Sequence, residues 1–469
     1  MGEPVATRNA KGSIELTTTH RTGPAIVWQG LIIGPVRADP RHLLRSFAGG
    51  TTISRVTGVR GALHRQARAG AAAMRGGRGQ RRAERCLNIA DLRAAARRAV
   101  PRAVFDFVDG AACDEVTARR NREDFARWTF APRVLTGVEH PRLESAVLGQ
   151  RMRIPLVGAP TGLTGLVHHE GELGIARAVH AAGGIYVLSA MASYTIEEIA
   201  EGTTGTTWFQ VYPWRDRGLV RALIERARDA DVKALVVTVD VPHAGARERD
   251  VRNGFGIPPR ATARTIAGAL KRPRWTADFM ARPRVTVANA VEPGAVRPDP
   301  ISLTTYITSQ FDPTTTWDDL GWIREQWHGP LAVKGILTPE DAREAVRVGA
   351  DAVVVSNHGG RQLDHAPSAI SALPAIAGAV GDDVALLLDG GIRRGSDVIK
   401  ALALGASACL TGRPLVYGLA VAGRAGAARA LDILTAELTL AAALLGCGDL
   451  SELDERWVMA RDRYCSAND

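Results

Sequence analysis

The residues best suited to chemistry lie at positions 356–361, which read Ser-Asn-His-Gly-Gly-Arg. His358 is a candidate general base, because an imidazole titrates near neutral pH and can take a proton from a substrate. Arg361 can hold a carboxylate through two parallel hydrogen bonds. The two glycines between them let a ligand approach the backbone closely. The segment therefore predicts a base and an anion-binding group that act on one small molecule.

Asp240 and Arg247 are candidates to complete this set. A histidine base needs an acidic partner that orients it and stabilises its protonated form, and Asp240 ends a predicted strand. Arg247 could share the carboxylate with Arg361. However, Arg249 and Arg252 stand nearby, and such a run is also typical of a charged surface. A single histidine after a strand is more often structural, so the functional interpretation depends on the whole set.

Two glycine–arginine steps predict a phosphate site. Positions 389–395 read Asp-Gly-Gly-Ile-Arg-Arg-Gly, and positions 412–414 read Gly-Arg-Pro. Glycine lets a phosphate approach the backbone, arginine grips it bidentately, and a following helix start adds a positive end. One such step alone would be an ordinary turn. Two of them, after the last two strands of a barrel, indicate phosphate binding.

Lys334 ends another predicted strand, where it would point into the protein interior. A buried ammonium group is costly without an anionic partner. A flavin ring is one such partner, because negative charge accumulates along its N1–C2 edge on reduction. A structural carboxylate is the other, and the sequence leaves both open. No Gly-x-Gly-x-x-Gly follows an early strand, so a nicotinamide-binding domain is not indicated.

The elements that must position these residues follow a repeating pattern. Short runs rich in Val, Ile and Leu alternate with segments of helical periodicity, as expected for parallel strands buried on both faces. The eight predicted strands are residues 154–159, 185–189, 207–212, 234–240, 331–335, 352–356, 384–389 and 408–412. Helices are predicted at residues 172–182, 219–228, 339–348 and 396–404, among others.

Eight strand–helix units predict an α/β fold of the (β/α)₈ TIM-barrel type, in which the polar residues at the carboxyl ends of the strands form the site. A doubly wound sheet is the alternative, but it would not usually need eight successive units. Residues 241–330 interrupt the regularity and are interpreted as a long loop after strand 4. Helical spacing after residue 87 predicts an N-terminal helical segment before the barrel.

The charge of the chain is unevenly distributed. Residues 1–85 hold 15 basic and 4 acidic residues, whereas the rest of the chain holds 44 and 45. We therefore expect residues 1–85 to be a basic, disordered extension and residues 86–460 to be the catalytic domain. A flexible basic tail could contact nucleic acid or anionic lipid, but the balanced body predicts no specific nucleic-acid binding.

The remaining composition limits cofactors and location. Five scattered cysteines form no Cys-x-x-Cys pair, which favours a reducing, cytoplasmic setting over a disulfide framework or a zinc site. His168 and His169 are adjacent and cannot chelate as an i, i+4 pair does, so no metal is expected. No apolar run reaches the roughly 20 residues that a spanning helix needs.

These motifs resemble the FMN-dependent 2-hydroxy acid dehydrogenase/oxidase family over residues 86–455. The segments 356–364, 389–395, Thr238-Val-Asp240 and Phe209-Gln-Val-Tyr212 stand in the order and spacing of that family. Residues 108–112, 242–247 and 321–324 are most similar to the bacterial L-lactate dehydrogenases. The resemblance implies the oxidation of an L-2-hydroxy acid to a 2-oxo acid, with FMN as cofactor and a quinone, a cytochrome or oxygen as electron acceptor.

The resemblance also implies a role for each matching residue. His358 would be the base and Asp240 its partner, while Arg361 and Arg247 would hold the substrate carboxylate. Tyr212 would hydrogen-bond the substrate oxygen, and Lys334 would stabilise reduced flavin. The isoalloxazine and ribityl chain would be surrounded by Pro160, Thr161, Ser189, Gln210, Thr238 and Ser356. The ribityl chain and phosphate would be held by Asp389, Gly391, Arg393, Gly412 and Arg413.

Two departures from the family concern the substrate. Phe107 stands where the family usually has a second tyrosine that helps to bind the carboxylate, and Met191 stands where glycolate oxidases have tryptophan. Both weaken the case for glycolate and leave lactate or a bulkier acid. The alternatives are a tailoring oxidase, such as a hydroxymandelate oxidase or a mycofactocin-type enzyme, and a basic-tailed nucleic acid or membrane binder on an inactive barrel.

The family further implies a homotetramer, located in the cytoplasm or at the inner face of the cell membrane. The loop segment that contains residues 271–275, Lys-Arg-Pro-Arg-Trp, with Phe279 and Met280, is interpreted either as a lid or as a segment that dips into a membrane near a quinone.

Overall fold

The computed structural model describes residues 7–8, 14–15, 77, 79–254, 263–290 and 309–461. Residues 1–67 form a unit of their own, in which an antiparallel pair joins β1 (Thr7–Arg8) to β2 (Ile14–Glu15). Most of the rest of the predicted disordered extension lies outside the described residues, but residues 77 and 79–85 are described, and residues 79–84 are helical rather than disordered. The second unit contains all the other described elements.

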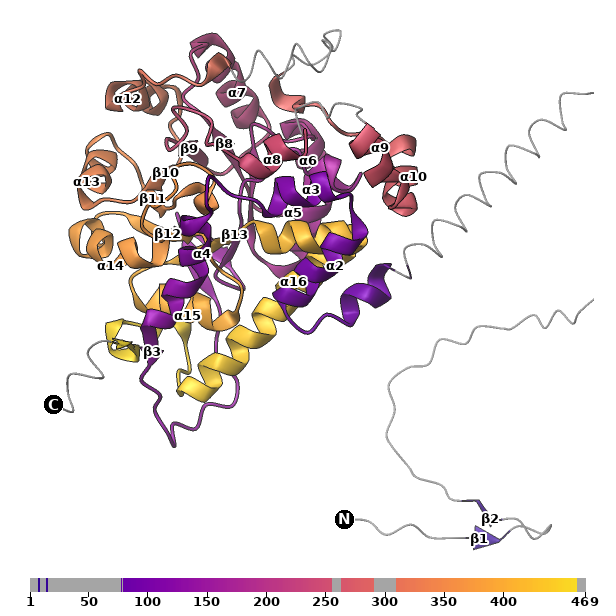
Figure 1. Cartoon of the computed structure of the whole chain (residues 1–469). Helices are drawn as coiled ribbons and strands as arrows, with labels where there is room; N and C mark the ends of the chain where they lie inside the picture. The colour runs from indigo at the N-terminus through magenta and orange to yellow at the C-terminus, as the bar shows by residue number, and fades with distance from the viewer. Residues whose placement is uncertain are drawn as a thin grey trace, which may run out of the picture. The chain divides into compact units, whose positions relative to one another are not determined.

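Eight parallel strands close into a barrel in the second unit, as the sequence predicts (Figure 1). They are β6 (Leu156–Gly158), β7 (Ile185–Ser189), β8 (Thr207–Val211), β9 (Leu235–Thr238), β10 (Leu331–Ile336), β11 (Ala352–Val355), β12 (Ala385–Asp389) and β13 (Ala408–Thr411). The closure pairs β13 with β6, where Cys409 lies opposite Leu156, and it excludes the doubly wound alternative. Several strands end one or two residues before the predicted limit, because polar residues such as Asp240 turn out of the sheet.

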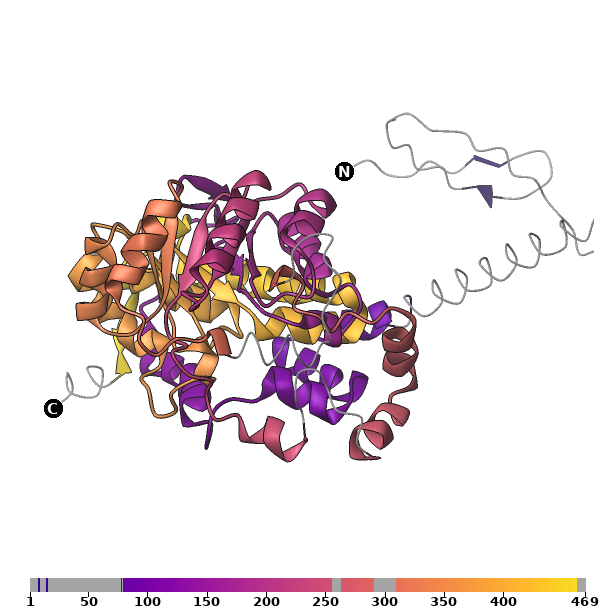
Figure 2. The ribbon, with the colours of Figure 1, turned by 90° about the horizontal axis from the view of Figure 1, so that it is seen from above.

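Helices surround the barrel in both views (Figures 1 and 2). They are α5 (Gly171–Ala182), α6 (Ile196–Gly202), α7 (Arg217–Asp229), α12 (Trp317–Gln326), α13 (Pro339–Arg347), α14 (Ala369–Val380), α15 (Gly395–Ala403) and α16 (Arg413–Leu445). Side chains of Asp216, Thr338 and Ser368 cap the amino termini of α7, α13 and α14, since each accepts a hydrogen bond from a first-turn amide. These caps explain why the helices begin where they do.

The core has two layers. One fills the space between the strands and the helices, and the other fills the barrel interior around residues such as Trp208, Val236 and Leu387. The hairpin of β4 (Ser145–Val147) and β5 (Gln150–Met152) joins the inner layer through Val147 and Met152 and closes the amino end of the barrel. The Trp208 indole N–H donates to Gln150 Oε1 at 2.7 Å, which satisfies a polar group that would otherwise be buried alone. The opposite, carboxyl end is left for ligands.

The predicted N-terminal helical segment is present. It comprises α2 (Ile89–Ala99), α3 (Arg102–Asp109) and α4 (Val116–Glu123), followed by β3 (Trp128–Phe130), which pairs with β14 (Val458–Ala460). Residues 79–84 are also helical. Short 3₁₀ turns occur at Asp124–Arg127, Thr164–Leu166, Ala288–Ala290, His358–Gly360, Leu450–Glu452 and Glu455–Trp457.

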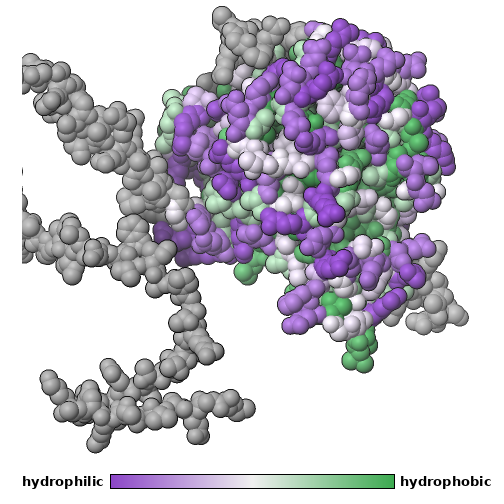
Figure 3. All heavy atoms as spheres, turned by 180° about the vertical axis from the view of Figure 1, so that it is seen from behind, coloured by the Kyte–Doolittle hydropathy of each residue, from purple (hydrophilic) through white to green (hydrophobic). Residues whose placement is uncertain are grey.

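The insertion after β9 carries α8 (Glu248–Arg252), α9 (Ala263–Leu270) and α10 (Pro273–Ala281). Both ribbon views place α9 and α10 at the periphery (Figures 1 and 2). Trp275 and Phe279 stack at 4.8 Å between ring centroids, and the Trp275 indole donates to Leu166 O. Among the described helices, none combines the length and hydropathy needed to cross a bilayer. Seen from behind, the surface is mostly hydrophilic with hydrophobic patches between (Figure 3).

Candidate active site

A pocket at the carboxyl end of the barrel gathers almost all the predicted site residues. Its lining includes His358, Arg361, Arg247, Tyr212, Lys334, Pro160, Thr161, Ser189, Gln210, Thr238, Asp389, Gly391, Arg393, Gly412 and Arg413. Asp240 and Ser356 lie behind this wall, where each hydrogen-bonds a lining residue. Segments from all eight strand ends therefore meet at one place, as expected for a barrel enzyme.

His358 and Asp240 form a dyad. His358 Nδ1 lies 2.9 Å from Asp240 Oδ1, and the other oxygen of Asp240 is buried without a partner among the described residues. With the carboxylate accepting from Nδ1–H, the lone pair of the imidazole is on Nε2. Gly335 permits this approach, because a Cβ there would lie 2.7 Å from Asp240 Cβ. The geometry suits a general base whose Nδ1 is held by a carboxylate and whose Nε2 is free to accept a proton.

The loop that carries His358 is held by a pair of amides that the sequence did not indicate. Asn121 Nδ2 donates to Asn357 Oδ1 at 2.7 Å, and Asn357 Nδ2 donates back to Asn121 Oδ1 at 2.8 Å. Asn357 Oδ1 also accepts from Gly360 N. His358 itself has φ +56°, a left-handed conformation that costs free energy in a residue with a Cβ. These contacts stabilise the strained turn and so fix the imidazole.

Lys334, Ser356 and Asp389 form a second buried group. Lys334 Nζ lies 2.8 Å from Asp389 Oδ2 and donates to Ser356 Oγ, and Ser356 donates to Asp389. Burial lowers the pKa of Lys334, but Asp389 and Asp240 outweigh it and raise this pKa above the usual value. The lysine therefore carries a positive charge. Its partner is a structural carboxylate, Asp389, which was one of the two alternatives that the sequence left open, and Lys334 also lines the pocket.

Arg361 faces the pocket with its charge uncompensated. Its guanidinium donates to Phe107 O at 2.8 Å and to Gly110 O at 3.1 Å, and no described carboxylate lies within ion-pair distance. Burial lowers its pKa well below the usual value, and the neighbouring charges of Arg247 and Arg413 lower it further. The Phe107 ring lies 5.5 Å from the guanidinium carbon. Such a cluster favours the binding of an anion.

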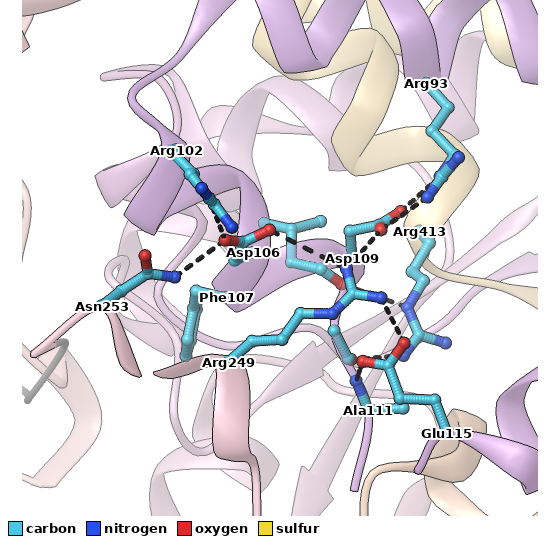
Figure 4. A network of polar contacts seen from close by, with 12 residues as sticks. Arg93, Arg102, Asp106, Phe107, Asp109, Ala111, Glu115, Arg249, Asn253 and Arg413 are labelled. Carbon is cyan, nitrogen blue, oxygen red and sulfur yellow. Dashed lines mark hydrogen bonds and ion pairs between the residues drawn. The ribbon is translucent and has the colours of Figure 1, made fainter. Parts of the chain in front are cut away.

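Arg249 is the main structural arginine of this run, whereas Arg247 has one longer ion pair, 3.8 Å to Asp250. It donates to Asp109 at 3.1 Å and to Glu115, as Figure 4 shows. Asp109 also accepts from Arg93, and Glu115 accepts from Ala111 N. Burial raises the pKa of Asp109, but the Arg93 hydrogen bonds outweigh it and hold this pKa at about 2. The network joins α3 to α8, and so places Arg247, at the start of α8, beside the pocket.

The phosphate end of the pocket lies at the last two strands. Gly391 has φ +86°, and a Cβ on it would lie 1.8 Å from Asn121 O, so only glycine fits. Arg413 donates to Val108 O, Gly359 O and Gly110 O, and Arg393 donates to Ile392 O. Neither arginine has an ion-pair partner among the described carboxylates. Helix α16 begins at Arg413 and adds the positive end of its dipole.

Unsatisfied hydroxyl groups indicate that a polar ligand belongs between these ends. Thr238 Oγ1 and Thr411 Oγ1 are buried in residues that line the pocket and have no partner among the described atoms. Buried polar groups are normally hydrogen-bonded. Together with Lys334, the arginines and the glycine turns, they fit a ligand with a polar ring system and a phosphate.

The comparisons with known proteins agree with this geometry. The family model described as FMN-dependent dehydrogenase matches residues 96–460. An L-lactate dehydrogenase from Pectobacterium atrosepticum is 44% identical over 366 residues, which are 77% of this chain and 94% of that protein. An L-lactate dehydrogenase from Xanthomonas euvesicatoria is 45% identical over 368 residues, again 77% of this chain and 94% of the relative.

Solved structures give the same result. The crystal structure of the monotopic membrane protein (S)-mandelate dehydrogenase has a TM-score of 0.77 at 37% identity and covers 80% of this chain and 100% of that one. A mandelate oxidase variant bound to (S)-mandelic acid has a TM-score of 0.67 at 38% identity, with 80% and 98% covered. Fold, pocket and sequence agree over most of the chain, which belongs to the FMN-dependent dehydrogenase family.

Proposed function

We propose that this FMN-dependent oxidoreductase oxidises an L-2-hydroxy acid with an apolar side chain to the 2-oxo acid. One observation carries the proposal: Arg361 lies in the pocket beside the His358–Asp240 dyad and donates only to carbonyl oxygens among the described residues. A substrate carboxylate would satisfy this charge and would bring the adjacent hydroxyl-bearing carbon to the base. Among the described carboxylates, none forms an ion pair with Arg361, and Asp250 lies 3.8 Å from the neighbouring Arg247.

The residues divide the work as follows. Arg361 and Arg247 bind the carboxylate bidentately and orient the substrate. His358 Nε2 accepts a proton from the substrate, and Asp240 stabilises the imidazolium that forms. The hydroxyl of Tyr212 stays protonated, because burial raises its pKa, and it donates to the substrate oxygen.

FMN, when bound, supplies the acceptor for the two electrons that the substrate loses. Lys334 supports that chemistry with a positive charge held by Asp389 and Ser356. Arg393, Arg413 and the amino terminus of α16 would hold the phosphate, and the unpartnered hydroxyl of Thr238 would hydrogen-bond the flavin. The other predicted flavin contacts remain Pro160, Thr161, Ser189, Gln210, Gly391 and Gly412, all of which line the pocket.

The substrate side chain follows from the apolar part of the lining. Phe107, Met191, Val241, Val287 and Phe311 contribute to it, and Phe311 stands edge-on to Tyr212 at 5.5 Å. An apolar side chain gains by contact with these residues, whereas glycolate has none to offer. The names of the relatives, L-lactate dehydrogenase and mandelate dehydrogenase, support a methyl or phenyl side chain.

For the electron acceptor we favour a quinone reached from a membrane surface. Ile266, Leu270 and Met280 on α9 and α10 are exposed, and Lys271 stands among them. Apolar and basic residues together suit an anionic bilayer. Trp275 and Phe279 pack inward, so the surface available to lipid differs from the one expected from the sequence. The relative described as a monotopic membrane protein supports this location.

Anaerobic flavin reduction tests the reaction. The FMN-loaded protein is mixed with glycolate, L-lactate, (S)-mandelate or 4-hydroxymandelate, and the bleaching of the flavin absorbance is followed. We expect lactate or mandelate to reduce the flavin far faster than glycolate does. His358→Ala should retain FMN but lose substrate-dependent bleaching. Full bleaching by that variant would refute the assignment of the base.

Sedimentation with vesicles tests the location. Leu270→Glu should weaken pelleting with vesicles that contain phosphatidylglycerol, because it places a charge on the exposed face of α9. Leu135→Glu, at an exposed position in the loop after β3, is the matched control and should pellet as the wild type does. Equal pelleting of both variants would exclude α9 from the contact.

A further inference from the structure

A second group of chemically capable side chains lies outside the pocket. His168 and His169 follow the 3₁₀ turn at Thr164–Leu166, and Asp278 reaches them from α10 in the insertion. His169 Nδ1 lies 2.8 Å from Asp278 Oδ1, and the two imidazole rings are 4.4 Å apart between centroids. One ligand atom from each of the three residues lies within 4.8 Å of the others. The adjacency of the two histidines argued against a metal, but the sequence could not place Asp278 beside them.

The spacing is close to that of a metal site. Zinc binds imidazole nitrogen and carboxylate oxygen at about 2.0–2.2 Å, so two ligand atoms of a tetrahedral ion lie roughly 3.3–3.6 Å apart. The three ligand atoms here all lie within 4.8 Å of one another, so side-chain rotations would bring them onto one ion. Glu170 Oε2, 3.7 Å from His168 Nδ1, is a further oxygen nearby, and it also accepts from Arg424 N at 2.7 Å.

We propose that His168, His169 and Asp278 bind one divalent transition-metal ion, and that Zn²⁺ fits this donor set. Two imidazoles with one carboxylate form a recognised zinc ligand set, and water or Glu170 completes the tetrahedron. Arg282 is the competitor, because its Nη2 lies 2.6 Å from Asp278 Oδ1. The Arg282 side chain is more than half exposed, and surface ion pairs are weak, so the cation can displace it.

The ion would join the insertion to the barrel. Asp278 is 109 residues from His169 in sequence, and the two segments already meet through the Trp275 hydrogen bond to Leu166 O. The segment that carries the histidines also lines the pocket through Thr164 and Val167. None of the three ligands lines the pocket, so the metal would be structural. It would connect α10 to the segment of residues 164–169, which borders the flavin site.

Metal binding to the FMN-loaded, tag-free full chain tests this site. After treatment with a chelator, the protein is titrated with Co²⁺, and visible absorption bands and equilibrium dialysis report geometry and stoichiometry. A Cys113→Ser background removes an exposed thiol that could bind Co²⁺ by itself. We expect one Co²⁺ per chain, displaced by Zn²⁺, and a melting temperature that rises with Zn²⁺ concentration.

Three variants make the test specific. His169→Gln and Asp278→Asn should each weaken Co²⁺ binding at least tenfold and abolish the Zn²⁺-dependent rise in melting temperature, while FMN stays bound. Arg282→Gln should tighten Co²⁺ binding, because it removes the competitor for the carboxylate. His328→Gln, at an exposed histidine outside the cluster, should bind as the wild type does. Binding that is unchanged in both ligand variants, or no Co²⁺ bands in the wild type, overturns the proposal.

Discussion

Replacing Asp240 with asparagine isolates the contribution of the dyad. The substitution keeps the size of the side chain but removes the negative charge 2.9 Å from His358 Nδ1. An amide can also donate to Nδ1, which would place the proton of the imidazole on Nε2, where the base needs its lone pair. We therefore expect the variant to bind FMN and substrate but to react slowly.

The magnitude follows from the burial of the contact. Asp240 is 13% exposed, so the interaction is screened less than a surface pair, for which about 0–1 kcal/mol is typical. A hydrogen bond to a charged group contributes roughly 1.5–3 kcal/mol, and the upper part of that range applies here. Losing about 2–3 kcal/mol of transition-state stabilisation slows the reaction roughly 30- to 150-fold.

Stopped-flow flavin reduction under anaerobic conditions measures this effect. The limiting rate should fall by that factor while the substrate concentration at half-saturation changes little, because Asp240 contacts the base and not the carboxylate. Glu248→Gln removes a partly exposed carboxylate paired with Arg252 and is the matched control. A wild-type limiting rate in Asp240→Asn, alongside an inactive His358→Ala variant, would show that the base works without its partner.

Other predictions concern the turn, the pH dependence and the substrate. Gly391→Ala should lower the melting temperature and release FMN, because its Cβ would meet Asn121 O, whereas Gly378→Ala, with open space around it, should gain about 0.5–1 kcal/mol. The pKa of Asp109 is about 2 against an ordinary 3.8, so the wild type holds about 2 kcal/mol of stability above pH 4 that is lost as the pH falls toward 2. Urea unfolding should show that this loss is absent in Asp109→Asn. Phe107→Tyr should lower the KM for lactate about tenfold in steady-state assays, since a hydroxyl there adds about 1.5 kcal/mol of hydrogen bonding to the carboxylate; an unchanged KM would place the substrate elsewhere.

The barrel could be predicted from the sequence because its signal is local. Each strand is a short apolar run that ends in a polar or glycine-rich step, and β7 occurs at the predicted residues. The same steps placed His358, Arg361, Lys334 and Arg413 in one pocket, since the carboxyl ends of parallel strands meet.

The supporting contacts could not be predicted because they join distant segments. Asn121 and Asn357 are 236 residues apart, and nothing in the spacing of either residue indicates the other. The same holds for Asp109 with Arg249 and for His169 with Asp278. Sequence patterns therefore indicate the catalytic and binding side chains. The distant side chains that position them can be identified only in the folded structure.

The pairing of β3 with β14 has a consequence for the order of synthesis. Thr129 Oγ1 bonds Met459 O across 330 residues, so β3 leaves the ribosome long before its partner exists. During that interval the edge of β3 is unpaired, and unpaired strand edges invite association with other chains. Contacts of such separation also form slowly. We therefore expect the last step of folding to be the docking of residues 458–460, and nascent chains to depend most on chaperones just before it.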